Sequence, residues 1–320
     1  MENFPSVSII TINYNQINVT REFLKSLSKL TYRNFEVIVI DNASLENHNS
    51  ELKHEFPSAR IYRTKENLGF TGGNNLGMKL SKGDYVLIIN NDTEIDQPDF
   101  LQKLIEPFLR DSSIGMVSPK IKYFDHPEII QFAGYNKINS FTGRNGQVGD
   151  GERDNGQYDF SSYTNYAHGA AMLVKKEVLE VVGVFSDQFF LCYEELDWSA
   201  QTVKQGYKIF YQAETYILHK ESITMGKSSP MKVYFNNRNR ILFMRRNTAL
   251  FDRLCFFLYF SFFTIPKNVL LFLVRFQFEH LKSFINAIIW NIKNVHIYKT
   301  TPFITQLRNV SIESIEKSEQ

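Results

Sequence analysis

The sequence predicts an α/β fold: a Rossmann-like mixed sheet flanked by helices, followed by a basic, apolar helical region. Three observations lead to this prediction. Apolar runs of strand length alternate with helix-length stretches, polar residues directly follow several of these runs, and a glycine-dense segment lies between the third run and the fourth. Because ligands bind beyond the carboxyl ends of parallel strands in such sheets, we expect a nucleotide-sized pocket at this edge.

The first strands and the helices between them follow from the apolar runs. Each run is short, rich in Val and Ile and bounded by polar residues, which is typical of a buried strand. The βαβ alternation predicts that the first half of the chain is doubly wound. The expected strands are 7–12, 35–40, 59–64, 85–90 and 114–118, and the expected helices are 18–30, 46–55, 73–81 and 98–110, the last with Pro98 at its start.

Polar clusters follow three of the expected strands. One such cluster is often an ordinary turn, because Asn, Asp and Ser cap helices and close loops. Three of them at one edge of a parallel sheet, beside a glycine-rich turn, instead predict a ligand site. The clusters are Asn13-Tyr14-Asn15, Asp41-Asn42-Ala43-Ser44 and Asn90-Asn91-Asp92-Thr93.

The glycine-dense segment runs from Glu66 to Leu80. Gly69, Gly72 and Gly73 remove side-chain bulk where a polyanion could approach, and a helix that starts nearby would point its unpaired N–H groups toward it. The segment therefore predicts an anion site. A tight structural turn is the alternative, since glycine pairs also make ordinary turns.

A chain of 320 residues can bury a sizeable core, and one catalytic domain with an appendage is as plausible as two domains. Its two cysteines, Cys192 and Cys255, have neither a disulfide framework nor metal-ligand spacing. The first expected strand begins at Val7, which leaves no room for a signal peptide before it. We therefore expect a reducing, cytoplasmic setting.

The ordered motifs resemble the family-2 inverting glycosyltransferases of the GT-A fold, and within that family the rhamnosyltransferase-like branch that builds bacterial surface polysaccharides. Beyond the clusters above, the resemblance rests on 168–172 (HGAAM), 193–197 (YEELD) and His219, so that it covers residues 6–246. It implies a catalytic domain over 1–246, with 247–320 as a helical region that associates with membrane or dimerises.

The resemblance implies a nucleotide-diphosphate sugar as donor, with dTDP-rhamnose as the first guess and UDP-hexoses or UDP-N-acetylhexosamines as alternatives. It assigns Asp41 to the base or ribose, and Asn67 and the following glycine segment to the diphosphate and sugar. The residues expected around the donor are Thr11, Asn13, Tyr14, Asn15, Asp41, Asn42, Ser44, Asn67, Gly69, Phe70, Gly72, Gly73, Asn74, Asn90 and Asn91.

A divalent cation, Mn²⁺ or Mg²⁺, is the expected cofactor, because the departing diphosphate needs its charge stabilised. The resemblance assigns Asp92 as its carboxylate ligand. The family has an Asp-x-Asp pattern where this chain has Asn90-Asn91-Asp92, so one acid is missing. His219 is the second candidate ligand, although a lone histidine after an apolar run is more often structural. A His and carboxylate pair favours Mn²⁺.

The general base is expected at Glu195, the second of the family's paired acids, at the start of a helix over 194–205. Many relatives have Asp there, and the longer Glu changes the reach. Glu194 and Asp197 share a helix face and are expected to hold the site or the acceptor, unless they only complement the helix N-terminus. One base without a second nucleophile suits a single displacement, hence inversion.

The acceptor is expected to be a glycan or a lipid-linked sugar. The resemblance places a small-residue strand, His168-Gly169-Ala170, beside its channel, and Trp198 is expected to stack near it unless it packs in the core. Arg238 could offset the diphosphate charge. The glycine-rich stretch 134–160 is expected either to fold over substrate or to be a disordered insertion.

Charge is distributed unevenly around a net +2. Residues 1–226 carry 22 Lys and Arg against 29 Asp and Glu, whereas residues 227–300 carry 12 against 2. Within the basic part, Leu254 to Val274 holds a single charge, Lys267, and Pro266 interrupts the run. This pattern predicts peripheral contact with the inner face of the cytoplasmic membrane; a dimer interface or a true membrane span are the alternatives.

Three classes of function remain open at this stage. The first is a glycosyltransferase. The second is a nicotinamide oxidoreductase, disfavoured because no G-x-G-x-x-G opens the first helix. The third is a catalytically silent sugar-nucleotide binding protein, which the missing acid before Asp92 favours. A nucleic-acid partner is not expected, because no nucleic-acid-binding module accompanies the basic residues.

Overall fold

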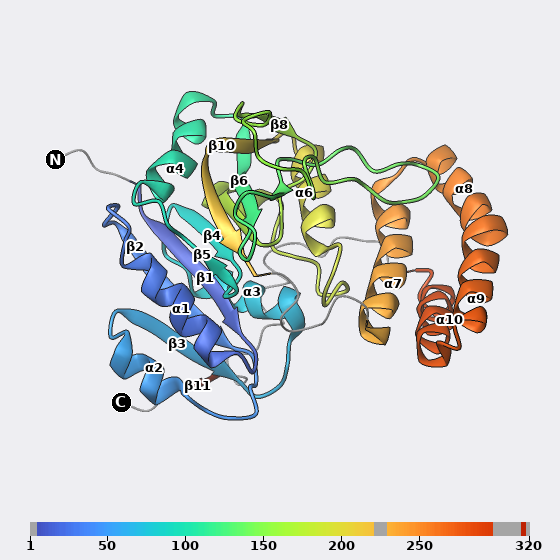
Figure 1. The fold of residues 1–320 in the computed structure, drawn as a ribbon, viewed down its shortest axis with the longest axis horizontal. Coiled ribbons are helices and arrows are strands. Elements are labelled where there is room, and N and C mark those ends of the chain that lie inside the picture. The colour runs from blue at the N-terminus through green and yellow to red at the C-terminus, as the bar shows by residue number, and fades with distance from the viewer. Residues whose placement is uncertain (1–4, 221–228, 297–314, 318–320) are drawn as a thin grey trace.

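A twisted mixed sheet forms the centre of the structure, a computed structural model that describes residues 5–220, 229–296 and 315–317. The helical unit α7 to α10 lies at one side of it (Figure 1). The elements of the sheet layer are β1 (Val7–Asn13), α1 (Ile17–Leu27), β2 (Phe35–Asp41), α2 (Asn49–Glu55), β3 (Ala59–Thr64), α3 (Gly69–Leu80), β4 (Tyr85–Ile89), β5 (Thr93–Glu94), α4 (Phe100–Arg110), β6 (Ile114–Tyr123), β7 (Ile130–Phe132), β8 (Ser162–Thr164), β9 (Ala171–Lys175), α5 (Lys176–Val181), α6 (Glu194–Lys204), β10 (Lys208–His219) and β11 (Ile315–Lys317).

The strand order is β11-β3-β2-β1-β4-β9-β6-β10-β5, with β7 paired to β6 and β8 to β10. Strands β1 to β4 are parallel to one another. Strand β9 is antiparallel to both β4 and β6, and β10 is parallel to β6. The register pairs Asn13 with Asp41, so the first two polar clusters lie side by side. The expected mixed sheet is confirmed.

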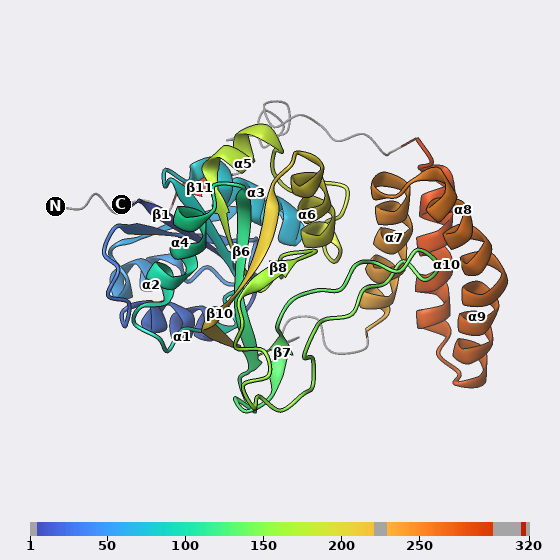
Figure 2. The same cartoon turned by 90° about the horizontal axis from the view of Figure 1, so that it is seen from above.

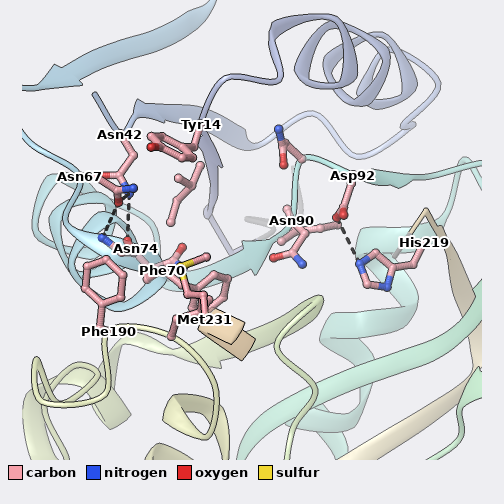
Figure 3. Close-up of a pocket in the computed structure, with 15 residues that line it drawn as sticks. Tyr14, Asn42, Asn67, Phe70, Asn74, Asn90, Asp92, Phe190, His219 and Met231 are labelled. Carbon is pink, nitrogen blue, oxygen red and sulfur yellow. Dashed lines mark hydrogen bonds and ion pairs between the residues drawn. The ribbon is translucent and has the colours of Figure 1, made fainter. Parts of the chain in front are cut away.

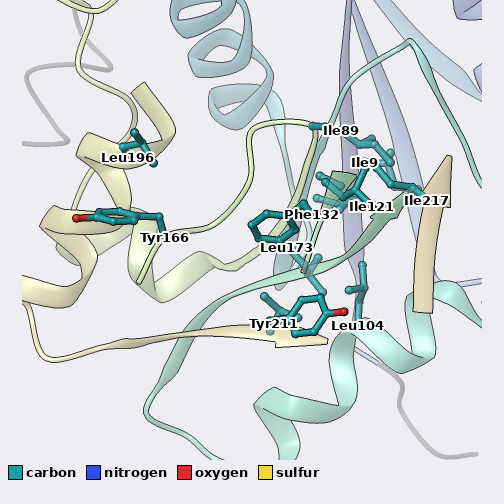
Figure 4. Close-up of a cluster of buried hydrophobic side chains, with 14 of the residues drawn as sticks. Ile9, Ile89, Leu104, Ile121, Phe132, Tyr166, Leu173, Leu196, Tyr211 and Ile217 are labelled. Carbon is teal, nitrogen blue, oxygen red and sulfur yellow. The ribbon is translucent and has the colours of Figure 1, made fainter. Parts of the chain in front are cut away.

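Both faces of the sheet are covered, because adjacent residues of each strand point to opposite sides. Ile9 on β1 packs in the larger cluster with Leu104 of α4 and with residues of β9 and β10 (Figure 4). Ile10 packs in a second cluster with Ile88, Met172 and Trp198. A strand buried on both faces reads as a continuous apolar run, which is why these strands stand out in the sequence.

Helix α3 begins at Gly69, four residues before the expected start, so the glycine pair lies inside the helix. A Cβ on Gly73 would come within 2.8 Å of Ile12 Cδ1, and one on Gly77 within 2.3 Å of Ile10 Cγ2. A Cβ on Gly72 would meet Leu68 Cβ at 2.7 Å. Gly72 and Gly73 therefore allow close packing within the helix and against β1, which corrects the expectation of an open phosphate turn.

The helical unit comprises α7 (Pro230–Asn247), α8 (Leu250–Tyr259), the π-turn η1 (Phe260–Thr264), α9 (Ile265–Val274) and α10 (Phe278–Lys293). Pro266 was expected to interrupt the apolar run, but the helix continues through it. The π-turn η1 lies just before Pro266 and accommodates the backbone N–H that proline lacks. Inside the unit, Phe260 contacts Phe256 and Phe284, with ring centroids 5.3 and 6.3 Å apart.

The stretch between β7 and β8 reaches across from the sheet layer to the helical unit (Figure 2). Its Gly143 packs closely on that unit: a Cβ there would lie 2.8 Å from Phe256 Cε2 and 3.1 Å from Arg240 Cγ. The Tyr193 hydroxyl donates a hydrogen bond to the Gly143 carbonyl at 3.0 Å. The stretch therefore folds as an ordered bridge and is not a disordered insertion.

A buried ion pair joins α6 to α7. Asp197 accepts from Arg246 Nε at 2.8 Å and from Nη2 at 3.0 Å, and Asn247 adds a third bond at 2.6 Å. Both charged side chains are almost completely buried. Asp197, expected in the catalytic set, thus faces α7 and holds two helices together.

We expect Asp197→Ala to destabilise the protein by about 3–5 kcal/mol, because it leaves the charge of Arg246 buried without its carboxylate. Urea unfolding followed by circular dichroism measures this loss. The matched control is Glu106→Gln, which removes the exposed partner of Arg110 and should cost less than about 1 kcal/mol. Equal losses in the two variants would contradict the structural role of Asp197.

Candidate active site

A cavity of about 410 Å³ opens at the carboxyl ends of β1, β2 and β4 (Figure 3). Ten of the residues expected at the donor or the metal line it. Phe190, Leu191 and Met231, which sequence reasoning missed, form part of its wall. The expected residues present are Tyr14, Asn42, Asn67, Gly69, Phe70, Asn74, Asn90, Asn91, Asp92 and His219.

We call this the donor-side cavity, because residues expected around the donor line it. Asn42 organises one side of it. Its amide nitrogen donates to Asn67 Oδ1 at 3.1 Å and to the Gly69 carbonyl at 3.0 Å, while its amide oxygen accepts from the Leu68 N–H at 2.9 Å. Gly69 has φ +70°, and a Cβ there would lie 2.5 Å from the Phe190 carbonyl oxygen. Only glycine fits this position, because both the backbone conformation and the close approach exclude a side chain.

The N-terminal amides of α3 are already engaged by the protein. The Gly69 N–H donates to Asn67 Oδ1 at 2.8 Å, and the Thr71 N–H donates to the Phe190 carbonyl at 3.2 Å. The helix therefore does not present an open row of donors to a diphosphate, as the sequence had led us to expect. Stabilisation of an anion in this cavity has to come mainly from elsewhere.

Asp92 and His219 face one another across the side of the cavity opposite Asn42 and Asn67 (Figure 3). The antiparallel pairing of Thr93 with His219 brings them together, and Asp92 Oδ1 lies 3.1 Å from His219 Nε2. His219 Nδ1 lies 2.8 Å from Gln131 Oε1. Since an amide oxygen only accepts, this contact needs a proton on Nδ1, and Nε2 is the ring nitrogen that faces the carboxylate.

This arrangement fits a cation. Asp92 Oδ1 is buried, and its nearest charged or polar neighbour that the structure gives is His219 Nε2 at 3.1 Å, so a carboxylate oxygen and a ring nitrogen face one point beside the cavity. Carboxylate and imidazole together suit Mn²⁺, and Gln131 orients the imidazole as outer partners of metal ligands usually do. Among the described residues no group of three or more His, Cys, Asp or Glu could hold a metal, so diphosphate oxygens and water would complete the shell.

Asp41 is buried and bound within the protein. Its carboxylate accepts from Asn13 Nδ2 at 3.1 Å and from Arg63 Nη1 at 3.1 Å, and the Ser44 hydroxyl also donates to it. It does not line the donor-side cavity. A neighbouring hollow of about 350 Å³ is instead lined by other members of the expected donor set, Asn13, Asn15 and Ser44, together with Ile17, Leu45, Glu46 and His48.

A larger cavity of about 820 Å³ lies against the first and shares Phe70, Asn90, Leu191 and His219 with it. The β7–β8 stretch, the start of α6 and one face of α7 form its other walls. We call it the acceptor-side cavity, because residues expected at the acceptor or as the base line it: His168, Gly169, Ala170, Glu194 and Glu195. Tyr135, Arg144, Asn145 and Gln147 come from the stretch 134–160, which was expected as a whole to fold over substrate or to be disordered. Those that sequence reasoning missed include Gln131, Tyr193, Lys232, Asn236, Asn237 and Arg240.

Glu195 stands in this cavity beside Gly169. A Cβ on Gly169 would touch the Glu195 side chain at 3.8 Å, so the glycine leaves room above the carboxylate. Residues 168–170 form the turn before β9, not a strand as expected. Burial raises the pKa of Glu195 to about 7. A carboxylate with a pKa near neutrality is a better base than an ordinary glutamate, and it becomes mostly ionised as the pH rises above 7.

Glu194 precedes it and is buried more deeply. Burial, with a further contribution from the charge of Glu195, raises the pKa of Glu194 well above its usual value. Its Oε2 atom is buried without a hydrogen-bond partner in the described structure. The neutral form of Glu194 is therefore favoured, which makes Glu195 the better candidate to accept a proton.

The raised pKa of Glu194 gives a pH-dependent stability. The folded state holds this proton and the unfolded state releases it near pH 4.5, so stability falls as pH rises above that value. We expect Glu194→Gln to melt like wild type near pH 5 and at least about 2 °C higher at pH 8, because ~1 kcal/mol shifts a domain of this size by about that much. Scanning calorimetry at both pH values measures it. A variant less stable than wild type at pH 8 would contradict the assignment.

The segment before α6 is strained: Phe190, Cys192 and Tyr193 all have positive φ, between 59° and 70°. Side chains of α7 hold it in place. Arg238 Nη2 donates to the carbonyls of residues 188 and 189, and Asn239 Nδ2 donates to those of residues 189, 191 and 192. Arg238, expected at the diphosphate, is thus a backbone clamp and lines neither main cavity.

Two further expected residues lie away from the cavities. Trp198 is buried, its indole N–H donates to the Gly183 carbonyl at 2.8 Å, and its ring packs on Phe185 with centroids 4.6 Å apart. It therefore packs in the core, the alternative that the sequence left open. Thr11 is completely buried in β1 and lines none of the described cavities.

Sequence comparison places the chain in a known family. The family model of glycosyl transferase family 2 matches residues 8–180, more than half of the chain, so this protein belongs to that family. The GT-A arrangement of the sheet and its flanking helices agrees with this assignment.

Related proteins are distant. A low-salt glycan biosynthesis hexosyltransferase, Agl10, of Haloferax volcanii is 24% identical over 74% of this chain and 74% of its own length. An N-acetylglucosaminyl-diphospho-decaprenol L-rhamnosyltransferase of Mycobacterium tuberculosis is 21% identical over 74% of this chain and 83% of its own. The chain spans only 28% of an uncharacterized protein, y4gI, of Sinorhizobium fredii, to which it is 26% identical over 79% of its length.

Solved structures share the fold. GalNAc-T7 with UDP, GalNAc and Mn²⁺ superposes with a TM-score of 0.62 at 14% identity, over 77% of this chain and 49% of that one. The mannosyltransferase PcManGT of Pyrobaculum calidifontis, with GDP-Man and Mn²⁺, gives 0.56 at 16%, over 95% and 79%. TarS residues 1–349 of S. aureus give 0.56 at 17%, over 88% and 80%. At these identities the likeness establishes the fold alone.

Proposed function

We propose that the protein is a metal-dependent, inverting glycosyltransferase that moves a sugar from a nucleoside diphosphate to a hydroxyl group of a glycan or lipid-linked acceptor. One observation carries the proposal: two cavities share a wall, with Asp92 and His219 at the first and Glu195 at the second. The donor sugar would occupy the first cavity with its anomeric carbon toward the shared wall, and the acceptor would enter from the second.

Glu195 acts as the general base in this proposal. Its carboxylate accepts the proton of the acceptor hydroxyl while that oxygen bonds to the anomeric carbon, and the bond from that carbon to the diphosphate breaks on the opposite side. No second carboxylate is needed as a nucleophile, and burial favours the neutral form of the neighbouring Glu194. A single displacement of this kind inverts the anomeric centre.

Asp92 and His219 would hold the divalent cation against the diphosphate. When bound, such a cation stabilises the negative charge that develops on the leaving nucleoside diphosphate. Mn²⁺ is our proposal, because of the imidazole ligand and because Mn²⁺ accompanies the nucleotide or nucleotide sugar in two structures of the same fold. Asn90, in place of an acid, would contribute an amide to the donor sugar or ribose.

The donor is proposed to be dTDP-rhamnose first and a UDP-hexose or UDP-N-acetylhexosamine second. A rhamnosyltransferase among the relatives supports the first, and a hexosyltransferase supports the second. A thermal-shift screen of nucleotide sugars with and without Mn²⁺ tests the proposal, since a specific ligand stabilises the native state by mass action. The donor should raise the melting temperature only with Mn²⁺. No shift with any nucleotide sugar, and no nucleotide release, would favour a silent protein.

The helical unit is proposed to lie on the anionic inner face of the cytoplasmic membrane. The run Leu250–Val274 has 25 residues and is long and apolar enough to cross a membrane, a test that a soluble core helix also passes. Its outer face is exposed, with Phe262 at 71% and Phe263 at 64%. Exposed Lys267, Arg275 and Lys282 accompany this apolar face. Exposed aromatic and basic side chains together fit the interface of an anionic bilayer.

We expect the double variant Phe262→Asp, Phe263→Asp to lose at least about tenfold in affinity for vesicles of phosphatidylglycerol and phosphatidylcholine, because burying one Phe contributes about 1.5–3 kcal/mol. Co-sedimentation measures it. The matched control is Phe160→Asp, which changes a side chain exposed to 80% on the sheet layer. If wild type fails to sediment and is a dimer that the double variant disrupts, the face is a protein interface instead.

A further inference from the structure

The acceptor-side cavity ends at two arginines from different parts of the chain. Arg240 comes from α7 and Arg144 from the β7–β8 stretch. Arg240 is only 3% exposed, and its Nε is buried without a hydrogen-bond partner. Asn145, which lines the same cavity, has a buried amide nitrogen that is also without a partner. Buried donors of this kind are costly unless a ligand accepts from them.

The two arginines share the cavity with three acidic residues, Asp150, Glu194 and Glu195. Within the described ranges, no Asp or Glu forms an ion pair with Arg144 or Arg240; the arginine–carboxylate pairs involve Arg21, Arg60, Arg63, Arg110 and Arg246. Burial and the nearby Arg144 charge lower the pKa of Arg240 to about 10, so it remains a cation at neutral pH. Arg144 and Arg240 thus form a positive pole of the cavity that no described carboxylate neutralises by a direct ion pair.

Tyr193 links this pole to the catalytic carboxylate. The charges of Glu195, Arg144 and Arg240 all act on the Tyr193 hydroxyl, and burial raises its pKa to about 12, so the phenol stays neutral and cannot compensate the arginines. The tyrosine therefore lies near both Glu195 and the arginine pair. A group bound by the arginines would sit close to a sugar whose hydroxyl faces Glu195.

The pole also lies next to the apolar helices. The Arg240 guanidinium stacks on Phe260, 4.9 Å from the ring centroid, and this contact fixes its orientation. Phe260 belongs to the same helical run whose other side exposes Phe262 and Phe263. Arg240 thus packs on the inner side of the helical run whose outer side we propose to contact membrane.

We propose that Arg144 and Arg240 bind the phosphate of an acceptor that is a phosphate ester, so that the reacting sugar is held between this phosphate and Glu195. The inference rests on the proposed function and names the acceptor class. Guanidinium groups match phosphate oxygens in geometry and charge, and the free donor of Asn145 adds a third contact. The phosphate could belong to a lipid anchor or to a water-soluble sugar phosphate, two sources with the same chemistry.

Calorimetric titration of the full chain in EDTA tests this, because chelation removes metal-dependent binding of diphosphate at the donor side. The probes are dodecyl phosphate, glucose 1-phosphate and the neutral dodecyl glucoside. Arg240→Gln and Arg144→Gln should each weaken binding of a phosphate probe at least tenfold and leave the neutral probe unaffected. Arg153→Gln, which removes an exposed charge from the β7–β8 stretch outside the cavity lining, is the matched control and should change nothing.

The outcomes separate the alternatives. Tighter binding of dodecyl phosphate than of glucose 1-phosphate indicates a lipid source, and equal binding indicates a soluble one. Unchanged phosphate affinity in Arg144→Gln, whose side chain is exposed and not needed for folding, or equal binding of the neutral and phosphate probes by wild type, would overturn the proposal. Mn²⁺-dependent stabilisation by nucleoside diphosphate, measured in the same variants, reports separately on the proposed donor site.

Discussion

Glu195→Gln should lower kcat by about 10²–10⁴-fold while leaving the affinity for the nucleotide sugar close to that of wild type. The amide has nearly the shape of the carboxylate but cannot accept the proton of the acceptor hydroxyl. The residue lines only the acceptor-side cavity, so the donor should bind as before. Steady-state kinetics with release of nucleoside diphosphate as the readout, and donor titration of the variant, measure the two effects.

The pH profile of the wild type supplies an independent test of the same residue. Because burial raises the pKa of Glu195 to about 7, its carboxylate is protonated below that value, and kcat should fall with decreasing pH and level off above it. Glu195→Asp, which keeps a carboxylate but shortens its reach, should retain more activity than Glu195→Gln. Near-normal turnover in Glu195→Gln would remove it as the base.

Asp92→Ala should abolish the Mn²⁺-dependent part of donor binding and with it nearly all activity. The carboxylate is the charged member of the Asp92–His219 pair, and a single imidazole without other acidic ligands holds a hard cation poorly. Titration with the nucleotide sugar in Mn²⁺ and in EDTA measures the loss. The variant should bind equally weakly in both.

Asp96→Ala is the matched control for this change. It removes a partly exposed carboxylate four residues along the chain, whose Lys29 partner lies outside the cavities. Donor affinity in Mn²⁺ should be unaffected. If Asp92→Ala instead kept full metal-dependent binding, the cation would have to bind elsewhere. The assignment of His219 as a metal ligand would then also be wrong.

The sheet could be predicted because its strands are buried on both faces. Runs such as 37–40 and 86–89 are apolar throughout, and this signal is local in the sequence. The start of α3 could not be predicted in the same way. Gly72 and Gly73 have low helix propensity, and only their packing against Leu68 and Ile12 explains why they lie inside a helix.

The donor-side residues were predictable because they follow strands that end at one edge. Asp41 is the exception. It lies at the carboxyl end of β2, as expected for a donor residue, but its carboxylate points into the protein because Arg63 and Asn13 bind it. Nothing local distinguishes it from Asn42, which does line the cavity. The difference lies in a partner on the next strand, at a distance of 22 residues along the chain.

The acceptor side was the least predictable part. Asp197 and Arg238 have the residue types of a binding site, yet Asp197 pairs with Arg246, 49 residues away, and Arg238 clamps a backbone about 50 residues away. Conversely, Arg240 gave no signal, because it lies in a helix rich in basic residues, and Arg144 was flagged only as part of the stretch 134–160 that could fold over substrate. Only the closure of the β7–β8 stretch on α7 brings them together.

The proposed reaction requires the donor sugar in the first cavity to face Glu195 in the second across the residues that the two cavities share. A crystal structure of Glu195→Gln with Mn²⁺ and the nucleotide sugar that gives the largest thermal shift tests this most directly. We expect an anomalous Mn²⁺ peak within bonding distance of Asp92 and His219, and the anomeric carbon facing residue 195 with space for one hydroxyl between them. A cation bound elsewhere would contradict the proposed metal site, and a sugar turned away from residue 195 would contradict the proposed general base.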